Sequence, residues 1–331
     1  MFTQEADAPT RILRRIVPRG LKSAIKKFIN RQIQTAMESF QREISVELEE
    51  SKQELRTGDQ PSARLKHFRD LFFLAHQYSS ECYLVPKAPG ERRYHGPSSL
   101  PIPPMERWEG YGQTNEHYLA SGEEHVRSMR EILERAGTPL ETTGRILDFG
   151  CASGRMIRWL EGAANTCEIW GTDINSSHII WCNQNLSPPF HFAATTSCPH
   201  LPFEDRYFGL VYAGSVFTHL DDLADTWFQE LRRVLRPGGR LFITIHDKSS
   251  IEIMKNEWPP DYWLMKVLRT YPEFEQFVKS DFGMFAIGRS TAAQVFHDVE
   301  YLSRRLEPFF HTLSVTPRGY SYQTAVLLER I

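Results

Sequence analysis

The sequence predicts an α/β fold in which a mostly parallel sheet carries helices on both faces. From residue 144 onward, short apolar runs typical of buried strands alternate with amphipathic helical patterns. A glycine-rich turn, residues 150–154, follows one predicted strand, and a carboxylate, Asp173, follows the next. Because right-handed crossovers bring the carboxyl ends of parallel strands to one edge of a sheet, we expect the turn and the carboxylate to form a ligand site there.

Composition places the chain among soluble globular proteins. Its 331 residues are 41% hydrophobic and 24% charged, which suits one large or two modest domains. The formal net charge of −2 gives no general reason to expect nucleic acid as a partner. Five cysteines, an odd number without a C-x-x-C pair, indicate reduced thiols and no metal site. No signal peptide or long apolar run is evident, so we expect a cytoplasmic protein, with membrane-peripheral placement as an option.

Residues 1–104 are expected to form an N-terminal helical arm with a proline-rich linker. Eight basic residues and no acidic residue lie between Arg11 and Arg31, and apolar residues at three- and four-residue steps predict a helix over residues 21–55. The arm could pack on its own domain or mediate self-association. Alternatively, residues 11–55 could make peripheral contact with an anionic membrane surface.

The linker separates this arm from a second domain, residues 105–331. A further helical pattern covers residues 64–78, and six prolines between residues 79 and 104 predict an extended segment without regular structure. Beyond it, Ser121 has a glutamate three residues later, so we expect a capping box that starts a helix ending at Gly137.

The elements of the second domain are predicted from their apolar periodicity. In chain order they are strand 144–149, helix 153–162, strand 167–172, helix 176–186, strands 190–194 and 209–213, helix 221–235 and strand 240–246. An insertion over residues 248–288, rich in tryptophan, tyrosine and phenylalanine, predicts an aromatic cap. Helix 290–306 and strands 309–316 and 322–329 close the chain, the two strands as an antiparallel hairpin.

The glycine turn and Asp173 predict a ligand that contains a ribose. Gly150 and Gly154 permit a tight turn with close approach of a ligand to backbone N–H groups. Asp173 lies 23 residues beyond Gly150, a spacing at which a carboxylate accepts hydrogen bonds from ribose hydroxyls, although it could instead cap the next helix. The turn reads G-x-x-x-G rather than G-x-G-x-x-G, which argues against a nicotinamide dinucleotide.

Four sequence blocks together resemble the class I S-adenosylmethionine-dependent methyltransferases, in particular the small-molecule and glycan methyltransferase group of types 11 and 25. The blocks are residues 148–154, 171–174, 201–212 and 235–241. Their order and spacing match the family, and the likeness covers residues 105–331. The resemblance implies a seven-stranded, mostly parallel, Rossmann-like sheet and S-adenosyl-L-methionine as the cofactor.

The resemblance also implies roles for individual residues. The methionine part of the cofactor would be lined by four residues: Asp148, Gly150, Ala152 and Gly154. Asp173 would take the ribose hydroxyls, and Ile174 would pack on the adenine, with Ala213 a further cofactor contact. Two departures from the family pattern stand out. Ala152 occupies a position usually held by glycine. Ser197 and Cys198 stand where an acid commonly contacts the adenine amino group, so a hydroxyl or backbone group of these residues would have to make that cofactor contact, or the affinity would be lower.

Methyl transfer needs an aligned acceptor and removal of one proton, so a base near neutral pH is expected. Two histidines follow predicted strands at the functional edge, His219 and His246. Either could act as the catalytic base, and either could instead bond to backbone or shape the pocket. No metal is expected to take part.

The resulting hypothesis is an enzyme that methylates a hydroxyl, rather than an amine, of a small molecule or glycan. Methylation of a protein or RNA is the alternative within enzymes, disfavoured because no Asn-Pro-Pro-Tyr-type block follows the fourth strand. A non-catalytic scaffold with a degenerate methyltransferase fold is the alternative of a different kind, and the altered adenine contact is its support.

Overall fold

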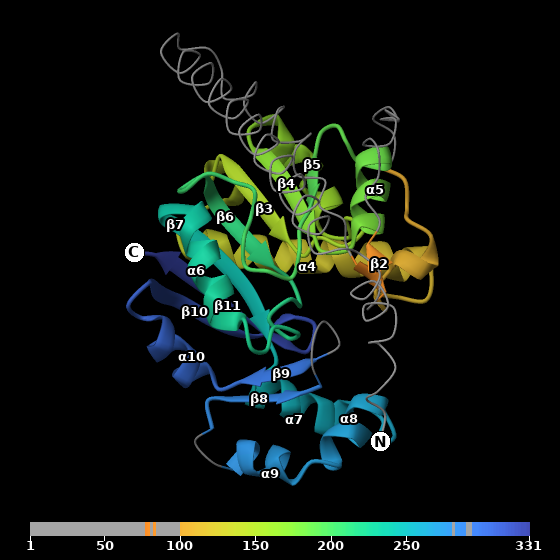
Figure 1. The fold of residues 1–331 in the computed structure, drawn as a ribbon, viewed down its shortest axis with the longest axis vertical. Helices are drawn as coiled ribbons and strands as arrows, with labels where there is room; N and C mark the ends of the chain where they lie inside the picture. Colours follow the sequence, from red (N-terminus) through yellow and green to blue (C-terminus); the bar gives the residue numbers. More distant parts are fainter. Residues whose placement is uncertain (1–76, 80–81, 84–99, 280–281, 289–292) are drawn as a thin grey trace, which may run out of the picture. The chain divides into compact units, whose positions relative to one another are not determined.

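The computed structural model describes residues 77–79, 82–83, 100–279, 282–288 and 293–331 (Figure 1). The predicted helix over residues 21–55, with its membrane contact or self-association, lies outside the described residues.

A short strand pair lies near the start of the described residues. β1 (Gln77–Ser79) and β2 (Cys82–Tyr83) pair antiparallel. The sequence predicted the end of a helix and an extended segment here. Residues 77 and 78, predicted to end the helix over residues 64–78, instead belong to strand β1.

A seven-stranded sheet forms the centre of residues 100–331, with the strand order β10-β11-β7-β6-β3-β4-β5. The strands are β3 (Arg145–Phe149), β4 (Glu168–Asp173), β5 (His191–Ala194), β6 (Phe208–Ala213), β7 (Leu235–Ile245), β10 (Phe310–Tyr320) and β11 (Gln323–Arg330). The pairs among β3 to β7 are parallel, and β11 pairs antiparallel with both β7 and β10. The predicted mostly parallel sheet of seven strands and its closing hairpin are confirmed.

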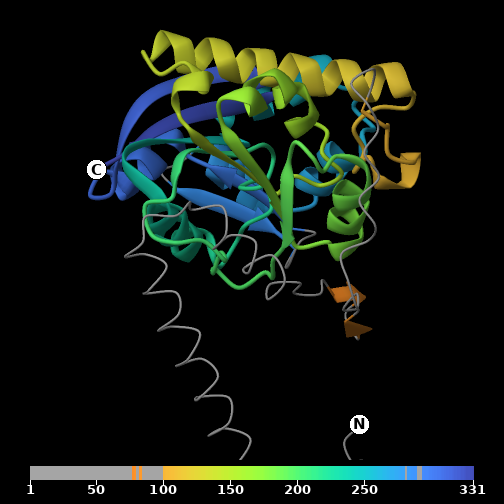
Figure 2. The same ribbon diagram turned by 90° about the horizontal axis from the view of Figure 1, so that it is seen from above.

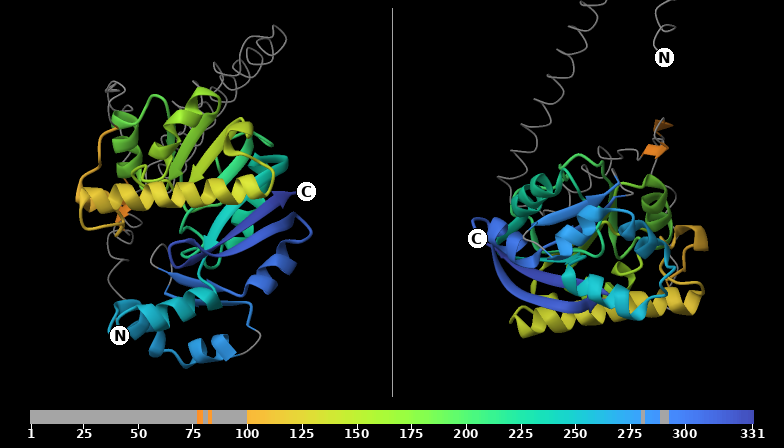
Figure 3. Two further views of the ribbon diagram at one scale, coloured as in Figure 1. Left: turned by 180° about the vertical axis from the view of Figure 1, so that it is seen from behind. Right: turned by 90° about the horizontal axis from the view of Figure 1, so that it is seen from below.

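Helices cover both faces of this sheet, because successive side chains of a buried strand point to opposite sides. On one face, Ile146 joins an apolar cluster with α4 (Asn115–Arg135), η3 (Ile157–Asn165) and α5 (Ser176–Asn185). On the other face, the Phe149 ring lies 4.7 Å from Trp227 of α6 (Ala224–Val234). Figure 2 shows α4 and α6 on opposite sides of the sheet, and Figure 3 shows α4 running across it.

The predicted capping box at Ser121 is wrong. Thr114 is the N-cap of α4, since its side chain accepts a hydrogen bond from the His117 N–H, and the helix already runs through Ser121. Gly122 keeps this middle part close to the glycine turn, because a Cβ atom there would lie 2.3 Å from the carbonyl oxygen of Arg155. The long helix therefore packs directly behind the predicted ligand site.

The helix predicted after the turn is also different in the structure. Residues 157–165 form a 3-10 helix, η3, instead of an α-helix that starts at residue 153. Ala152 and Gly154 have φ values of 44° and 78°, which no right-handed helix accommodates. The chain therefore completes its turn around the ligand site before it becomes helical.

The insertion forms a helical cap with its own apolar core. It contains α7 (Lys248–Glu257), α8 (Trp263–Arg269), α9 (Pro272–Lys279) and β8 (Met284–Ile287), and β8 pairs with β9 (Gln294–His297). Side chains such as Phe274, Phe277 and Phe296 fill this core. Strand β9 takes the place of residues 294–297 of the predicted helix 290–306, and α10 (Val299–Leu306) forms its second half.

None of the helices in the described ranges has the length and apolar character required to span a bilayer.

Candidate functional site

The site lies at the carboxyl end of β3, where the strand order changes direction. β3 has β4 on one side and β6 on the other, so the connections from this central strand diverge and leave a crevice. Gly150 follows β3 with a φ of 82°, and a Cβ atom there would lie 2.4 Å from Val216. The turn therefore requires glycine both for its backbone conformation and for contact with the segment after β6.

Asp173 is hydrogen-bonded directly to the glycine turn. Its Oδ2 accepts a hydrogen bond from the Ala152 N–H at 2.9 Å, and its Oδ1 accepts one from the Asn175 N–H at 2.7 Å. Ala152 has a left-handed φ of 44°, a conformation that favours glycine and is strained for alanine. The structure thus brings together the glycine turn and Asp173, the two parts of the predicted ligand site.

Asp148 is a buried carboxyl with one unsatisfied oxygen. The residue is 3% exposed, and no described residue makes a close hydrogen bond to Oδ2, although the Tyr212 hydroxyl is near enough to lower the pKa of the carboxyl. Burial raises the pKa of Asp148 to about 7, and the Tyr212 hydroxyl, followed by the positive charge of Arg155, opposes part of this rise. A buried polar atom without a close partner is costly, which makes this carboxyl a candidate partner for an N–H or ammonium group of a ligand.

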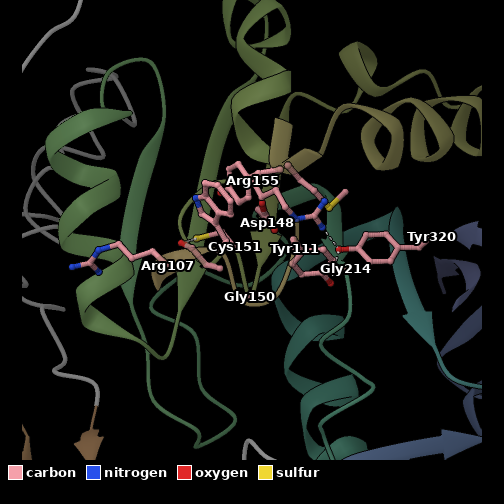
Figure 4. A pocket seen from close by; sticks show the side chains of 12 residues that line it. Arg107, Tyr111, Asp148, Gly150, Cys151, Arg155, Gly214 and Tyr320 are labelled. Atoms are coloured by element: carbon pink, nitrogen blue, oxygen red, sulfur yellow. Dashed lines mark hydrogen bonds between the residues drawn. The ribbon is translucent and has the colours of Figure 1, made fainter. Parts of the chain in front are cut away.

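A hollow adjoins Asp148 and the glycine turn. It has about 370 Å³ of empty space, its open mouth included, and is lined by Asp148, Gly150, Ala152 and Arg155 among others (Figure 4). Gly154 shapes the turn without lining the hollow: a Cβ atom there would lie 2.4 Å from Leu186. The methionine-side residues predicted from the resemblance therefore meet at one place, except Gly154.

The segment 105–112, which we call the strap, forms another wall of the hollow through Arg107, Trp108 and Tyr111. Arg107 Nη1 donates to the backbone oxygen and the hydroxyl of Ser177 at 2.8 and 2.9 Å. Glu109 Oε1 lies 2.6 Å from His178 Nε2. The strap is therefore attached to the start of α5.

The attachment of the strap continues to the glycine turn. The other ring nitrogen of His178, Nδ1, lies 2.5 Å from the Ser153 hydroxyl, and the hydrogen bond from His178 lowers the pKa of Glu109. The sequence analysis did not predict this series of hydrogen bonds, because Glu109 and His178 are 69 residues apart and the sequence contains no motif that pairs them.

The predicted adenine-side residues do not line the hollow. Ile174 follows β4 and is half-buried, whereas Ser197 and Cys198 are exposed in the loop after β5. Ala213 is fully buried at the end of β6. Their roles as cofactor contacts remain predictions.

His219 lies close to the glycine turn. Its backbone N–H donates to the carbonyl of Val216 at 2.9 Å, and Val216 is the residue that touches Gly150. Its Nδ1 lies 2.7 Å from the carbonyl oxygen of Ala293, which can only accept. The proton is therefore on Nδ1 and a lone pair remains on Nε2. Burial lowers the pKa of His219, so the ring is neutral at neutral pH.

His246 follows β7 and is 1% exposed. Its Nε2 lies 3.1 Å from the Tyr322 hydroxyl, and the two rings stack with centroids 5.3 Å apart. Burial lowers the pKa of His246 to about 3. The ring is therefore a neutral part of the wall between β7 and the cap.

A polar network supports the end of β6 beside these histidines. Ser215 has a left-handed φ of 58°, and its N–H donates to Thr244 Oγ1 at 2.7 Å. Thr244 Oγ1 donates to Gln323 Oε1 at 2.7 Å, and Gln323 Nε2 donates back to the Ser215 hydroxyl at 2.8 Å. The closed network holds the strained residue in place at the functional edge.

Comparison with known proteins matches residues 147–243 to the family described as "Methyltransferase domain". A malonyl-(acyl-carrier protein) O-methyltransferase of Enterobacter lignolyticus (strain SCF1) is 26% identical over 160 residues, covering 47% of this chain and 61% of the relative. A ubiquinone/menaquinone biosynthesis C-methyltransferase UbiE of Neisseria meningitidis serogroup C (strain 053442) is 34% identical over 112 residues, covering 31% and 43%. The chain thus spans less than two thirds of either relative.

Two solved structures are similar to this chain at lower sequence identity than these relatives. The PH0226 protein from Pyrococcus horikoshii OT3 gives a TM-score of 0.44 at 19% identity, with 62% of this chain and 91% of that chain covered. Magnesium protoporphyrin IX methyltransferase (ChlM) from Synechocystis PCC 6803 gives a TM-score of 0.44 at 16% identity, with 68% and 92% covered.

Proposed function

Because this chain carries a class I S-adenosylmethionine-dependent methyltransferase domain, whose cofactor is S-adenosyl-L-methionine, we propose that the protein methylates a hydroxyl of a small molecule or glycan. The observation that carries the cofactor part of the proposal is the buried carboxyl of Asp148, with one oxygen that lacks a close partner, beside a glycine turn that is hydrogen-bonded to Asp173. The methionine ammonium group of the cofactor suits the carboxyl of Asp148, and its ribose hydroxyls suit the carboxylate of Asp173. The residues present therefore fit it.

When bound, S-adenosyl-L-methionine supplies a methyl group on a sulfonium that leaves readily. The chain's own task is to align the acceptor and to accept its proton. Of the two predicted histidines, His219 suits this role better. It presents an Nε2 lone pair and is half-buried, whereas His246 is almost fully buried and has a pKa of about 3. We therefore assign proton removal to His219 and a wall position to His246.

The aromatic wall between β11 and the cap supports an acceptor with a ring. The Trp258 ring lies 4.5 Å from Tyr322 and 4.4 Å from Tyr262, measured between centroids. Aromatic faces of this kind pack well on sugar or carbocyclic rings. The two relatives are named as an O-methyltransferase of malonyl-(acyl-carrier protein) and a C-methyltransferase of ubiquinone/menaquinone biosynthesis, so a test has to include carboxyl and carbon acceptors.

Calorimetry with S-adenosyl-L-methionine tests the first part of the proposal. We expect binding to the full chain and a large loss in Asp173→Ala, whereas Asp261→Ala, an exposed carboxylate of the cap, should bind as the parent does. Absence of binding to the parent would favour a non-catalytic scaffold.

Transfer of labelled methyl groups tests the acceptor. The panel should contain oligosaccharides, phenols, carboxylates, amines, a protein extract and RNA. Label on a sugar or phenol oxygen is expected. Label confined to carboxyl, carbon, protein or RNA acceptors would refute hydroxyl transfer while leaving the methyltransferase intact.

A further inference from the structure

Three arginines meet at the edge of the sheet opposite the hollow, and we call Arg206, Arg232 and Arg330 the arginine cluster. Arg206 precedes β6, Arg232 belongs to α6, and Arg330 ends β11, next to the end of the chain marked C in Figure 1. The hollow adjoins the carboxyl end of β3, which runs parallel to β6. The cluster therefore lies about one strand length away from the hollow.

Shared contacts hold the members of the cluster together. The Arg206 N–H donates to the carbonyl oxygen of Arg233 at 2.8 Å, and Arg330 Nη1 donates to the same oxygen at 3.4 Å. The guanidinium carbon of Arg232 lies 5.5 Å from the centre of the Phe309 ring. Phe309 directly precedes β10, whose first residue pairs with Arg330. The three side chains thus form one group around the end of α6.

Carboxylates close to the cluster are bound to other arginines. Asp205 and Glu230 both form salt bridges with Arg233, at 2.9 and 2.6 Å. Glu329 forms a salt bridge with Arg240 at 2.5 Å. Among the described residues, no carboxylate forms a salt bridge with a member of the cluster. The cluster therefore lacks a directly bound counter-charge within this part of the chain.

Arg330 is the most buried member of the cluster. The residue is 8% exposed, and its Nε has no hydrogen-bond partner among the described residues. Nε of Arg232 is likewise buried without such a partner. Burial, followed by the charges of Arg232 and Arg206, lowers the pKa of Arg330, and Asp205 offsets only part of this effect. Because guanidinium groups stay charged in proteins, the repulsion is relieved only when an anion binds.

A phosphate group suits the cluster better than a carboxylate does. Guanidinium groups bind both kinds of anion through paired N–H donors. A phosphate monoester, however, carries a charge of about −1.5 to −2 at neutral pH and three acceptor oxygens, whereas a carboxylate has one charge and two oxygens. Arg206 is exposed and Arg232 is half-buried, so an anion can reach both from solvent. The number of charges and their access therefore favour phosphate.

We propose that the arginine cluster binds a phosphate group, carried by a small molecule or by a lipid headgroup, at a site separate from the hollow. The phosphate neutralises three neighbouring positive charges and occupies guanidinium N–H groups at the outer end of α6. Because the hollow is at the opposite edge of the sheet, the phosphate binds whether or not the cofactor is present. The inference therefore does not depend on the proposed function.

Calorimetry of the full chain with inorganic pyrophosphate, without divalent cations and at about 0.15 M ionic strength, tests the proposal. We expect saturable binding with a Kd below about 1 mM and a higher melting temperature in its presence. Arg330→Met and Arg232→Met should each weaken binding about tenfold, the effect of one lost charged hydrogen bond. Arg206→Gly should weaken binding about threefold or more, since this side chain is more exposed.

Two variants keep the test independent of folding. Arg206 has a left-handed φ of 61°, so Arg206→Gly removes the charge and also suits the backbone. Arg127→Met removes an exposed charge from α4 and should keep the affinity within about twofold of the parent. Circular dichroism checks folding of each variant, and if Arg330→Met does not fold, Arg206→Gly and Arg232→Met decide. Equal weakening by Arg127→Met would overturn the proposal, because it would show attraction by general charge.

Flotation with phosphatidylcholine vesicles that contain phosphatidic acid distinguishes the two sources of phosphate. The parent is compared with the double variant Arg206→Gly/Arg232→Met. Pyrophosphate binding with equal flotation of both proteins would support a small phosphorylated ligand. Flotation that is reduced in the double variant would support a lipid headgroup. Absence of pyrophosphate binding together with equal flotation would overturn the phosphate site, whatever the result for S-adenosyl-L-methionine.

Discussion

On the β3–β4 side of the sheet edge, backbone N–H groups and buried charges surround the hollow, whereas neutral histidines and aromatic rings dominate the β6–β7 side. Asp148, Arg155 and Asp173 are all positioned around the glycine turn. Across the edge, His219 and His246 have lowered pKa values because they are buried. The first side is suited to hold a charged cofactor, and the second is suited to accept a proton beside an uncharged acceptor. Substitutions on the two sides should therefore change different observables.

The largest effect should come from His219→Gln. We expect kcat with an identified acceptor to fall at least about hundredfold, because general base catalysis typically contributes 10²- to 10⁴-fold. Affinity for S-adenosyl-L-methionine, measured by calorimetry, should stay within about threefold. The paired variant His246→Gln should lower kcat much less, since a buried ring with a pKa of about 3 is a poor base at neutral pH. Equal losses of kcat in both variants would break the distinction between them.

Asp148→Asn should instead weaken the binding of the cofactor. At pH 8 we expect binding of S-adenosyl-L-methionine to weaken about hundredfold, because a buried charged pair is lost. The cofactor-free variant should nevertheless melt at a higher temperature than the parent above pH 7. The folded-state pKa of Asp148 is raised to about 7, so folding binds protons between the unfolded value and pH 7 and the parent loses stability as pH rises through that window. A lower melting temperature at pH 8 would contradict this account.

Proton linkage at Asp148 should also appear in the parent. A carboxyl with a pKa of about 7 binds an ammonium group only when deprotonated. Affinity for S-adenosyl-L-methionine should therefore rise about tenfold from pH 6 to pH 8, as the deprotonated fraction grows from roughly a tenth to nine tenths. Calorimetry in buffers of different ionisation enthalpy should detect proton release near pH 7. Asp148→Asn should lack both effects, and a parent with flat affinity over this range would refute the linkage.

The smallest effect is expected from Ala152→Gly. The left-handed φ of 44° costs alanine about 1 kcal/mol or more, and the greater freedom of glycine in the unfolded chain offsets part of the gain. The variant should be more stable by roughly 0.5 kcal/mol in urea denaturation, with cofactor affinity within about threefold of the parent. Ala120→Gly, at an exposed position of α4, should instead destabilise by about 1 kcal/mol. A loss of stability in both would show that the Ala152 methyl group is needed for packing.

Sequence patterns predicted the sheet well because they report local structure. The continuous burial of β6 and the apolar run of β3 both appear as short hydrophobic stretches in the chain. Predictions were weaker where a contact between distant segments decides the element. Ser121 has the pattern of an N-cap, yet Gly122 packs against the Arg155 backbone and the helix runs through both. Likewise, β9 pairs with β8 in a stretch whose periodicity also fits a helix.

The sequence by itself determined the order of the strands along the chain, the glycine turn and the carboxylate that follows the next strand. These depend on residues that are neighbours in the chain and on general rules of α/β topology. Only the tertiary structure decided which distant side chains meet at the site. Arg155 reaches Tyr320 across 165 positions, and Glu109 reaches His178 across 69. Burial then set the pKa of Asp148, because desolvation depends on everything packed around a group and not on its sequence neighbours.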